Sequence, residues 1–317
     1  TRNRVPHRFI DLDRDGSAAS SPDGRPLEAG DLPMLVSGQK VLTAPTILEA
    51  ANALNLRAPN KTAKVAWDCL IIGGGPGGLG AAVDAATEGL STILVEQHDL
   101  GSGTSSHSSR LVHGGLRYLE QGHLGLVAEA ARERATLLAT ASHLVWPLEF
   151  VFPIHSGDRV KLWKLAAGVW VYDLLSAFRK TRRHRIRGKR AVLDAEPMLR
   201  EKGLHGGARY FDAQCDDARL VLTTARSAIE HGAQVANYMP VRRLVIRDGR
   251  VAGAEVEDLV TGETGIIQPA AVLNATGPWG DGVRRMEEPV VAPLLRTTRA
   301  VHIVVPRERV GHRHAIT

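Results

Sequence analysis

The sequence contains only two cysteines, Cys69 and Cys215, and no long hydrophobic run. Two cysteines cannot by themselves build a disulfide framework or a four-ligand zinc site, which fits a reducing compartment. A stretch of about 18 apolar residues, the length that spans a membrane, is missing. A signal peptide's charged start and apolar core are also missing, as is a twin-arginine signal. These absences favour a cytoplasmic location.

The composition is that of a folded protein with a modest basic excess. Hydrophobic residues make up 44% of the 317 residues and charged residues 23%, which is enough to fill the core of one large or two ordinary domains. The net charge of +6 is compatible with nucleic acid, a membrane surface or a phosphorylated substrate as partner. Because the chain begins with Thr1 rather than methionine, we expect a fragment of a longer protein.

Residues 1–65 are predicted to form a disordered or loosely structured leader. The stretch 11–26 is rich in Asp, Ser, Gly and Pro and has no periodic apolar residues. Its spaced aspartates open like a calcium-binding loop, but Pro22 stands where that loop requires a glutamate. We therefore expect no metal site.

From residue 65 onward the pattern predicts a strand, a turn, a helix and a second strand. Residues 65–72 are apolar and partly β-branched, as in a buried parallel strand, and residues 91–96 repeat this pattern. A glycine-rich turn and a run of small and apolar residues at helical spacing lie between them. This order favours a parallel, doubly wound sheet.

The glycines of this turn have the spacing of a dinucleotide-binding site. Gly73 allows a tight turn, Gly75 lets backbone N–H groups approach a pyrophosphate, and Gly78 lets the helix pack on the strand. The helix N-terminus would then hold the phosphates. Glu96 ends the second strand, and its carboxylate suits a ribose diol and repels a 2′-phosphate. FAD or NAD therefore fits better than NADP.

Three later segments favour an extended flavin cofactor over NAD. Residues 100–110 supply hydroxyls and backbone donors, although a flexible polar linker would have a similar composition. The run at 110–119 has a glycine pair that lets backbone approach a planar ring, and the strand at 271–275 ends in a small-residue turn. The residues predicted to bind FAD are Gly73, Gly75, Gly78, Glu96, Thr104, Ser105, Ser106, His113, Gly114, Gly115, Ala275, Thr276 and Gly277.

The second half of the chain predicts a helix followed by an antiparallel meander. Residues 216–231 have the pattern of an amphipathic helix, with Asp216 and Asp217 capping its free N–H groups. Strands are predicted at 241–248 and 251–258, and another follows. The meander indicates a second, smaller domain or a β appendage to the parallel-sheet protein.

These segments together resemble the FAD-dependent glycerol-3-phosphate dehydrogenases, a branch of the flavoproteins that also contains glycine and D-amino-acid oxidases. The most specific match is His-Gly-Gly-Leu-Arg-Tyr-Leu at 113–119, and all matches occur in family order across residues 68–317. The others are Ile-Gly-Gly-Gly from residue 72, Thr-Ser-Ser from 104, Asp-Asp-Ala-Arg-Leu from 216, Asn-Ala-Thr-Gly-Pro-Trp from 274 and His-Ile-Val-Val-Pro-Arg from 302. Residues 1–65 match nothing in the family.

The resemblance implies an α/β fold with a Rossmann-type FAD-binding domain and a substrate domain built on an antiparallel sheet. The FAD-binding parts are expected at about 66–145 and 212–285, and the substrate-domain parts at about 146–211 and 286–317. Further pocket motifs of the family are expected beyond the last matching segment. They are absent from the 317 residues, so we expect the oxidoreductase region 66–317 to be incomplete at its C-terminus.

The resemblance also implies that the C2 hydroxyl of sn-glycerol 3-phosphate is oxidised to dihydroxyacetone phosphate, with hydride transfer to FAD. Arg117 and Tyr118 match residues that line the family's substrate pocket, and Arg117 would offer a planar fork to the phosphate. His302 matches the family's active-site histidine and is a candidate proton acceptor, with a hydrogen-bonded core histidine on a strand as the alternative. His113 is a second candidate. The predicted catalytic residues are His302, Arg117 and Tyr118.

The basic excess is concentrated in residues 161–190, which hold ten Lys or Arg and one acid, for a net charge of +9, while the rest of the chain sums to −3. The first half of this segment is apolar and aromatic, as in helices that dock among lipid headgroups. The predicted anchors are Trp163, Trp170, Tyr172 and Phe178. A core-packed helix followed by a solvated basic loop is the alternative, and it is slightly favoured. Nucleic-acid binding is disfavoured because the aromatic residues lie apart from the charges.

The expected electron acceptor and the alternative functions follow from the same family resemblance. Respiratory members of the resembled family sit on the membrane and reduce quinone, whereas others reduce O₂. The basic, aromatic segment modestly favours quinone and a peripheral position on the inner face of the cytoplasmic membrane, and a homodimer stays open. Alternatives are an amine or amino-acid oxidase of the same superfamily, or an inactive truncated flavoprotein or membrane-binding fragment. Arg117 and its motif argue against the oxidase.

Overall fold

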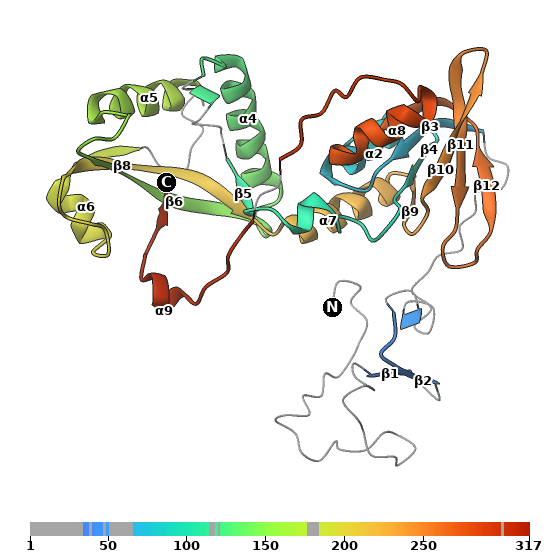
Figure 1. The fold of residues 1–317 in the computed structure, drawn as a ribbon, viewed down its shortest axis with the longest axis horizontal. Coiled ribbons are helices and arrows are strands. Elements are labelled where there is room, and N and C mark those ends of the chain that lie inside the picture. Colours follow the sequence, from blue (N-terminus) through green and yellow to red (C-terminus); the bar gives the residue numbers. More distant parts are fainter. Residues whose placement is uncertain are drawn as a thin grey trace.

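The computed structural model describes residues 34–37, 40–46, 49–50, 66–113, 118–119, 121–175, 184–298 and 301–317. Most of them form two lobes, each with its own β-sheet and covering helices (Figure 1). An antiparallel hairpin of β1 (Met34–Ser37) and β2 (Lys40–Thr43) lies within the predicted leader. The leader otherwise falls almost entirely outside the described residues.

The first lobe is built on a parallel sheet with the strand order β13-β3-β4-β9. Its strands are β3 (Trp67–Ile72), β4 (Thr92–Val95), β9 (Gln234–Ala236) and β13 (Pro269–Asn274). Leu70, Ile71 and the whole of β4 are buried, because both faces of a parallel sheet are covered. The two strands predicted on either side of the glycine-rich turn are therefore confirmed.

Two helices cover one face of this sheet, and a second, three-stranded sheet with one further helix covers the other face. The covering elements are α2 (Pro76–Thr87), α7 (Asp217–Glu230), α8 (Gly280–Glu287), β10 (Val241–Arg247), β11 (Arg250–Glu257) and β12 (Thr264–Ile267). Leu79 of α2 and Val221 of α7 belong to one hydrophobic cluster with Ile71 and Leu94, while β10 to β12 and α8 pack on the opposite face. The predicted meander is therefore an appendage of the parallel sheet and not a separate domain.

Helix α7 begins as its sequence predicts. The Asp216 side chain accepts a hydrogen bond from the Arg219 N–H (3.2 Å), and Asp217 lies in the first turn, where negative charge is favourable. Cys215 donates a hydrogen bond to Asp217 Oδ1 (3.0 Å), and burial together with this acceptor raises the pKa of the Cys215 thiol to about 12. The thiol is therefore protonated at neutral pH, which makes it a poor nucleophile.

The second lobe is built on a mainly antiparallel sheet with the strand order β14-β6-β8-β5, and β7 also pairs with β8. Its elements are β5 (Leu111–Val112), α4 (Leu124–Thr140), β6 (Val145–His155), α5 (Leu162–Leu175), β7 (Arg185–Gly188), α6 (Lys189–Ala195), β8 (Leu204–Cys215), α9 (Arg307–Val310) and β14 (Ala315–Ile316). Leu165 and Val169 of α5 are buried against Ile154 and Ala208 of the sheet. Strand β5 and helix α4, which the sequence assigned to the FAD-binding part, lie with this second sheet.

The secondary structure of the basic segment, residues 161–190, differs in part from the prediction. Its apolar half is the helix α5, as expected. Its basic half was expected to be a solvated loop, but residues 185–195 form β7 and α6, because β7 pairs with β8 in register. Residues 176–183, including the predicted anchor Phe178, lie outside the described residues.

A buried carboxylate fastens the end of the chain to the second lobe. Glu196 is fully buried and accepts hydrogen bonds from the backbone N–H groups of Arg313 and His314 and from both His312 and His314 rings, at 2.6–3.1 Å. Burial alone would raise the pKa of Glu196, but these donors outweigh it and lower the pKa. The clamp holds β14 beside β6, where Ala315 pairs with Phe150.

Candidate flavin and substrate sites

The glycine-rich turn between β3 and α2 requires two of its glycines for steric reasons. Gly73 has φ = +116°, and a Cβ there would lie 2.6 Å from the carbonyl oxygen of Ala275. A Cβ on Gly78 would lie 2.0 Å from the carbonyl oxygen of Gly73. Since real Cβ atoms do not approach oxygen this closely, only glycine lets α2 pack onto the end of β3.

The N-terminus of α2 opens onto free space beside a hydroxyl-rich segment. The first N–H groups of a helix have no acceptor within the helix, and they carry the positive end of its dipole. A Cβ on Gly75 would meet nothing closer than Ser105 Oγ, 4.0 Å away, in the short 3₁₀ turn Thr104–Ser106. Backbone donors, free space and a hydroxyl group therefore converge where the sequence placed a pyrophosphate.

Two further segments close around the same turn. Ala275 donates its N–H to Ile72 O (2.9 Å), which brings the end of β13 against the end of β3. Thr276 Oγ1 donates to Asn274 Oδ1 (2.7 Å), and the turn Gly277–Trp279 follows. The predicted cofactor residues at 73–78, 104–106 and 275–277 thus come from distant parts of the sequence and meet at one end of the parallel sheet.

Glu96 is held at the end of β4 by the glycine turn itself. Its Oε2 accepts the Gly74 N–H (2.7 Å) and its Oε1 accepts the His98 N–H (2.9 Å). These bonds fix the carboxylate beside the turn, and each carboxylate oxygen has a further lone pair available. The predicted contact between Glu96 and a ribose diol stays a prediction, and this geometry is compatible with it.

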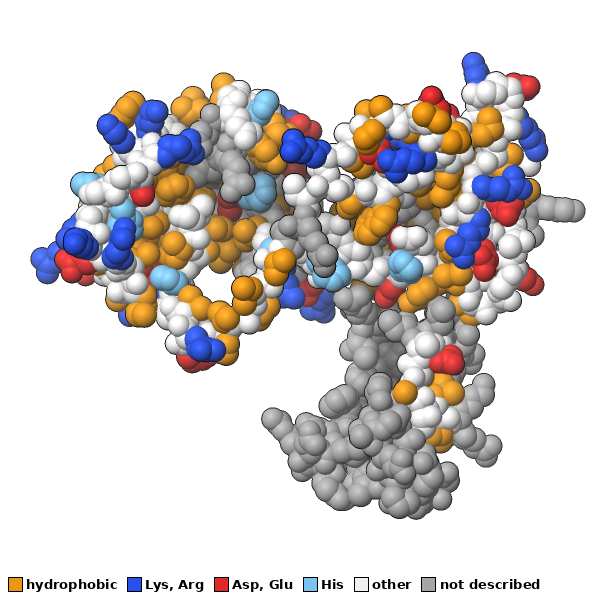
Figure 2. Space-filling view, in the orientation of Figure 1, with side chains coloured by type: hydrophobic (Ala, Val, Ile, Leu, Met, Phe, Trp, Pro, Cys, Tyr) orange, Lys and Arg blue, Asp and Glu red, His pale blue; other side chains and the backbone are white. Residues whose placement is uncertain are grey.

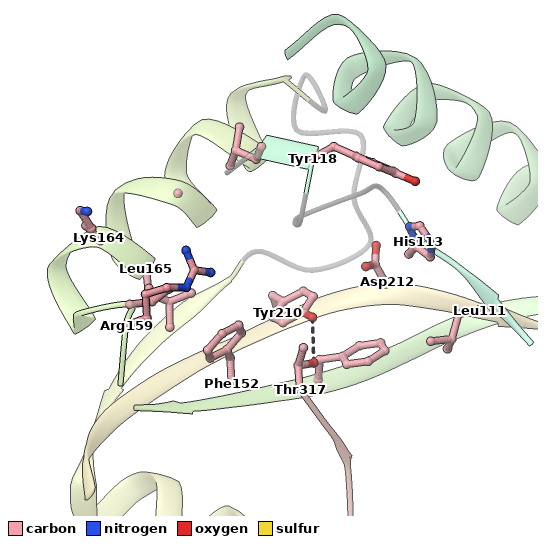
Figure 3. Close-up of a pocket in the computed structure, with 14 residues that line it drawn as sticks. Leu111, His113, Tyr118, Phe152, Arg159, Lys164, Leu165, Tyr210, Asp212 and Thr317 are labelled. Carbon is pink, nitrogen blue, oxygen red and sulfur yellow. Dashed lines mark hydrogen bonds between the residues drawn. The ribbon is translucent and has the colours of Figure 1, made fainter. Parts of the chain in front are cut away.

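The second lobe contains a cavity of about 820 Å³ between α5 and the sheet (Figure 3). Three residues of the His-Gly-Gly-Leu-Arg-Tyr-Leu motif, His113, Tyr118 and Leu119, line it. The ring centroids of His113 and Tyr118 are 6.5 Å apart. The floor is aromatic and apolar, and Tyr210 of β8 forms a hydrogen bond with Thr317 there (3.1 Å). Asp212, which sequence reasoning missed, also lines this cavity.

Asp212 is anchored from behind by two other buried side chains. Arg134 of α4 is ion-paired with Asp212 Oδ1, and Tyr172 of α5 donates a hydrogen bond to the same oxygen (2.8 Å). Burial, followed by the negative charge of Asp212, raises the pKa of Tyr172, so the phenol stays protonated and donates. This buried network joins α4, α5 and β8 at the cavity wall. Tyr172, predicted as a membrane anchor, is fully buried, and that prediction was wrong.

His302, a predicted catalytic residue, is not among the residues that line this cavity. His302 lies in an extended, exposed segment at 301–306 that is not a strand, so the expected strand is wrong. Val301 and Val304 beside it are 80% and 95% exposed, because no sheet neighbour covers them in the described part of the chain. Gly114, Gly115 and Arg117 lie outside the described residues.

A carboxylate in α8 helps to fasten the segment that leads to His302 to the first lobe. Asp281 in the first turn of α8 accepts the backbone N–H groups of Leu294 (3.1 Å) and Leu295 (3.0 Å) and pairs with Arg284 (2.8 Å). These donors, with the Leu295 N–H contributing most, lower the pKa of Asp281 to about 2.

This arrangement predicts a pH-dependent loosening of the segment. Because the pKa of Asp281 is depressed on folding, its stabilisation is present above the ordinary value of 3.8 and is lost as the pH falls toward about 2. We expect the amides of Leu294 and Leu295 to be protected from hydrogen exchange at neutral pH and to lose protection over that range. Asp281→Asn should remove the protection at neutral pH, whereas Glu287→Gln in the same helix should not. Full protection in Asp281→Asn would contradict this assignment.

Comparison with known proteins settles the family. The family model for FAD dependent oxidoreductases (DAO) matches residues 68–316. The chain belongs to this family. It is 38% identical over 244 residues to the aerobic glycerol-3-phosphate dehydrogenase of Staphylococcus epidermidis, a match that covers 77% of this chain and 44% of that protein. The corresponding protein of Bacillus subtilis is 36% identical over 241 residues, covering 76% and 43%.

Two solved structures agree with the fold. The glycerol-3-phosphate dehydrogenase from Bacillus halodurans, complexed with FAD, is 32% identical with a TM-score of 0.56, covering 72% of this chain and 38% of that one. The L-proline dehydrogenase from P. horikoshii, 16% identical with a TM-score of 0.58 and covering 72% and 57%, shares the fold. The α/β class with a Rossmann-type sheet is confirmed. The chain spans less than half the length of the curated relatives it matches.

Proposed function

We propose that the chain binds FAD at the end of the β13-β3-β4-β9 sheet. The proposal is supported by the cradle at Gly75, which a Cβ would fill, by the helix N-terminus facing it, and by the hydroxyls of the 104–106 turn. In this arrangement the turn at 73–78 holds the pyrophosphate and Glu96 holds the adenosine ribose. The turn at 275–277 contacts a second part of the cofactor.

The function we infer is oxidation of glycerol 3-phosphate to dihydroxyacetone phosphate. It is supported chiefly by identities of 36–38% to proteins named aerobic glycerol-3-phosphate dehydrogenase, and by a cavity lined by the most specific motif of the sequence. Bound FAD supplies the hydride acceptor for this reaction. The chain's part is to hold the substrate against the cofactor and to accept the proton of its C2 hydroxyl. Arg117 and Tyr118 stay proposed substrate contacts.

Anaerobic reduction of the flavin tests this function. The purified chain, loaded with FAD, is mixed with glycerol 3-phosphate while the visible flavin absorbance is recorded. Bleaching by glycerol 3-phosphate and not by amino acids supports the proposal, and the reverse preference would support the amine or amino-acid oxidase. A chain that binds no flavin would favour the inactive flavoprotein or membrane-binding fragment.

Of the two histidines considered from the sequence, we propose His113 as the proton acceptor, because it lines the cavity and His302 does not. His113→Asn should slow flavin reduction by about 100-fold or more, the usual contribution of a general base. His302→Asn should have a much smaller effect. Stopped-flow reduction at saturating glycerol 3-phosphate measures both, with flavin content as the control for folding. The opposite ranking would make His302 the acceptor.

We also propose that electrons pass to quinone at a membrane surface that α5 contacts. In the described residues, no helix is long and apolar enough to cross a membrane. Trp163, Trp170 and Leu174 share one face of α5 by their spacing, and they are 67%, 62% and 64% exposed. Figure 2 shows Lys and Arg side chains gathered over α5 and near α6. Exposed aromatic residues beside basic ones are typical of interfacial docking.

Vesicle binding tests the membrane contact. Each large apolar side chain that enters the interface contributes about 1.5 kcal/mol or more, so replacing Trp163 and Trp170 by alanine should weaken binding to anionic vesicles by at least about tenfold. Trp146→Ala, a half-exposed tryptophan on β6, is the matched control and should bind as the wild type does. Equal sedimentation of all three proteins with the vesicles would argue against α5 as the contact.

A further inference from the structure

The chain passes between the two lobes at residues 107–110 and again at residues 215–216, and these two crossings lie side by side. On the first crossing, the hydroxyl-rich turn Thr104–Ser106 leads into β5. On the second, β8 ends at Cys215 and α7 begins at Asp217. Figure 1 shows β5 and the start of α7 between the lobes, where β5 also pairs with the end of β8. The proposed flavin site therefore lies on one side of the crossings and the cavity lies on the other.

A ring of hydrogen bonds ties the first crossing to the second. The Arg110 N–H donates to Ser108 Oγ (2.8 Å), and Ser108 Oγ donates in turn to Asp217 Oδ2. Cys215 donates its thiol proton to Asp217 Oδ1 (3.0 Å) and its backbone N–H to the carbonyl oxygen of Arg110 (2.9 Å). The ring of Arg110, Ser108, Asp217 and Cys215 thus closes on itself, and both oxygens of the Asp217 carboxylate take part in it.

The backbone at Arg110 is strained, and the ring is what holds it. Its φ is +60°, in the left-handed region, which costs energy in any residue other than glycine. Such a conformation persists where surrounding contacts fix it, and strained backbone clusters at functional sites. Here the ring bonds both the N–H and the carbonyl group of Arg110. The first crossing therefore has a fixed bend.

Helix α7 also supports the hydroxyl-rich turn directly. A Cβ on Gly101 would lie 3.0 Å from Cγ1 of the buried Val221, so the backbone before the turn packs closely on α7. Ser106 Oγ donates to the carbonyl oxygen of the same Gly101 (2.6 Å). The start of α7 thus contacts the flavin segment through Val221 and the crossing through Asp217, and it links the two as one rigid unit.

We propose that Ser108 and Asp217 are positioning residues, which hold the cavity of the second lobe at a fixed distance and angle from the flavin of the first. This inference rests on the proposed function, because transfer of the C2 hydride to FAD requires the two reacting atoms to lie in near contact. Their separation depends on the angle between the lobes, and a misplacement of about 1 Å can slow such a step by about 100-fold. Neither side chain has to touch the substrate.

Ser108→Ala and Asp217→Ala test this role. Each should lower the rate of flavin reduction at saturating glycerol 3-phosphate by about tenfold or more, while the KM and the flavin content change little. The two effects should not add in the double variant, because either substitution breaks the same ring. Ser108→Thr keeps the hydroxyl group and should restore the rate. A wild-type rate in Ser108→Ala would overturn the proposal.

Asp216→Ala is the matched control for a purely structural effect. It removes the same charge from the start of α7, together with the helix cap on the Arg219 N–H, but it leaves the ring of hydrogen bonds intact. It should therefore weaken the helix at least as much as Asp217→Ala does and still reduce the flavin at about the wild-type rate. Equal slowing in Asp216→Ala and Asp217→Ala would overturn the positioning role.

Hydrogen exchange provides a readout that does not depend on turnover. The backbone N–H of Cys215 should exchange about tenfold or more faster in Ser108→Ala and Asp217→Ala than in the wild type and Asp216→Ala. If this pattern holds and glycerol 3-phosphate does not reduce the flavin even of the wild type, the tie between the lobes stands and the proposed function is wrong. Unchanged exchange at Cys215 in both ring variants would overturn the tie, whatever their activity.

Discussion

Gly78→Ala is expected to abolish FAD retention and to destabilise the first lobe. The added Cβ would lie 2.0 Å from the carbonyl oxygen of Gly73, so α2 must move away from the end of β3. That movement displaces the helix N-terminus from the pyrophosphate position and opens the contact of Leu79 with the sheet. Forcing extra atoms into a packed site costs about 1–3 kcal/mol, and a clash with backbone belongs at the upper end of this range.

Flavin content per polypeptide and the denaturant midpoint measure this effect. Gly80→Ala, two residues along the same helix, is the matched control, because a Cβ there meets nothing within 4 Å. It should keep the flavin and gain up to about 1 kcal/mol in stability, since alanine favours the helix more than glycine does. Wild-type flavin content in Gly78→Ala would show that the turn does not act as described.

Arg134→Met is expected to destabilise the second lobe by about 3–5 kcal/mol, the usual cost of leaving one partner of a buried ion pair uncompensated. Asp212 would remain buried without the guanidinium charge of Arg134, while Tyr172 still donates a hydrogen bond to it. Because the network joins α4 and α5 to β8, the loss should also loosen the cavity wall. Chemical unfolding followed by circular dichroism measures the change in the free energy of unfolding.

Two control variants distinguish the buried Arg134–Asp212 ion pair from an ion pair on the surface. Arg226→Met breaks an exposed pair with Glu230 on α7 and should cost no more than about 1 kcal/mol. The double variant Arg134→Met/Asp212→Leu removes both buried charges and should be more stable than Arg134→Met alone. If Arg134→Met and Arg226→Met cost the same, the buried pair contributes no more than a surface pair.

The first lobe was largely predictable because its constraints are local. A buried strand, glycines at fixed spacing and a helix must follow one another within a short stretch of sequence. The elements β3, α2 and β4 therefore lie close together along the chain. The cap at Asp216 is equally local. The strand predicted around His302 failed because an extended run of β-branched residues becomes a strand only when another strand pairs with it.

The cavity was not predictable in the same way. Asp212 lies among apolar neighbours on β8, and nothing in that pattern says that Arg134 from α4 and Tyr172 from α5 will meet it. The periodicity of α5 likewise predicted an aromatic face without showing that Tyr172 points inward while Trp163 and Trp170 point outward. Such contacts depend on how helices cross the sheet.

The sequence by itself determined the dinucleotide turn, the order of the elements around it and the family, because steric limits on glycine and the periodicity of buried strands act between near neighbours. It also determined that two cysteines provide no disulfide framework. The tertiary structure decided that the meander covers the parallel sheet, that His113 and not His302 lies at the cavity, and that Asp212 shares that cavity. Those outcomes depend on packing between segments that lie far apart in the sequence, because periodicity and local sterics do not specify how helices cross a sheet.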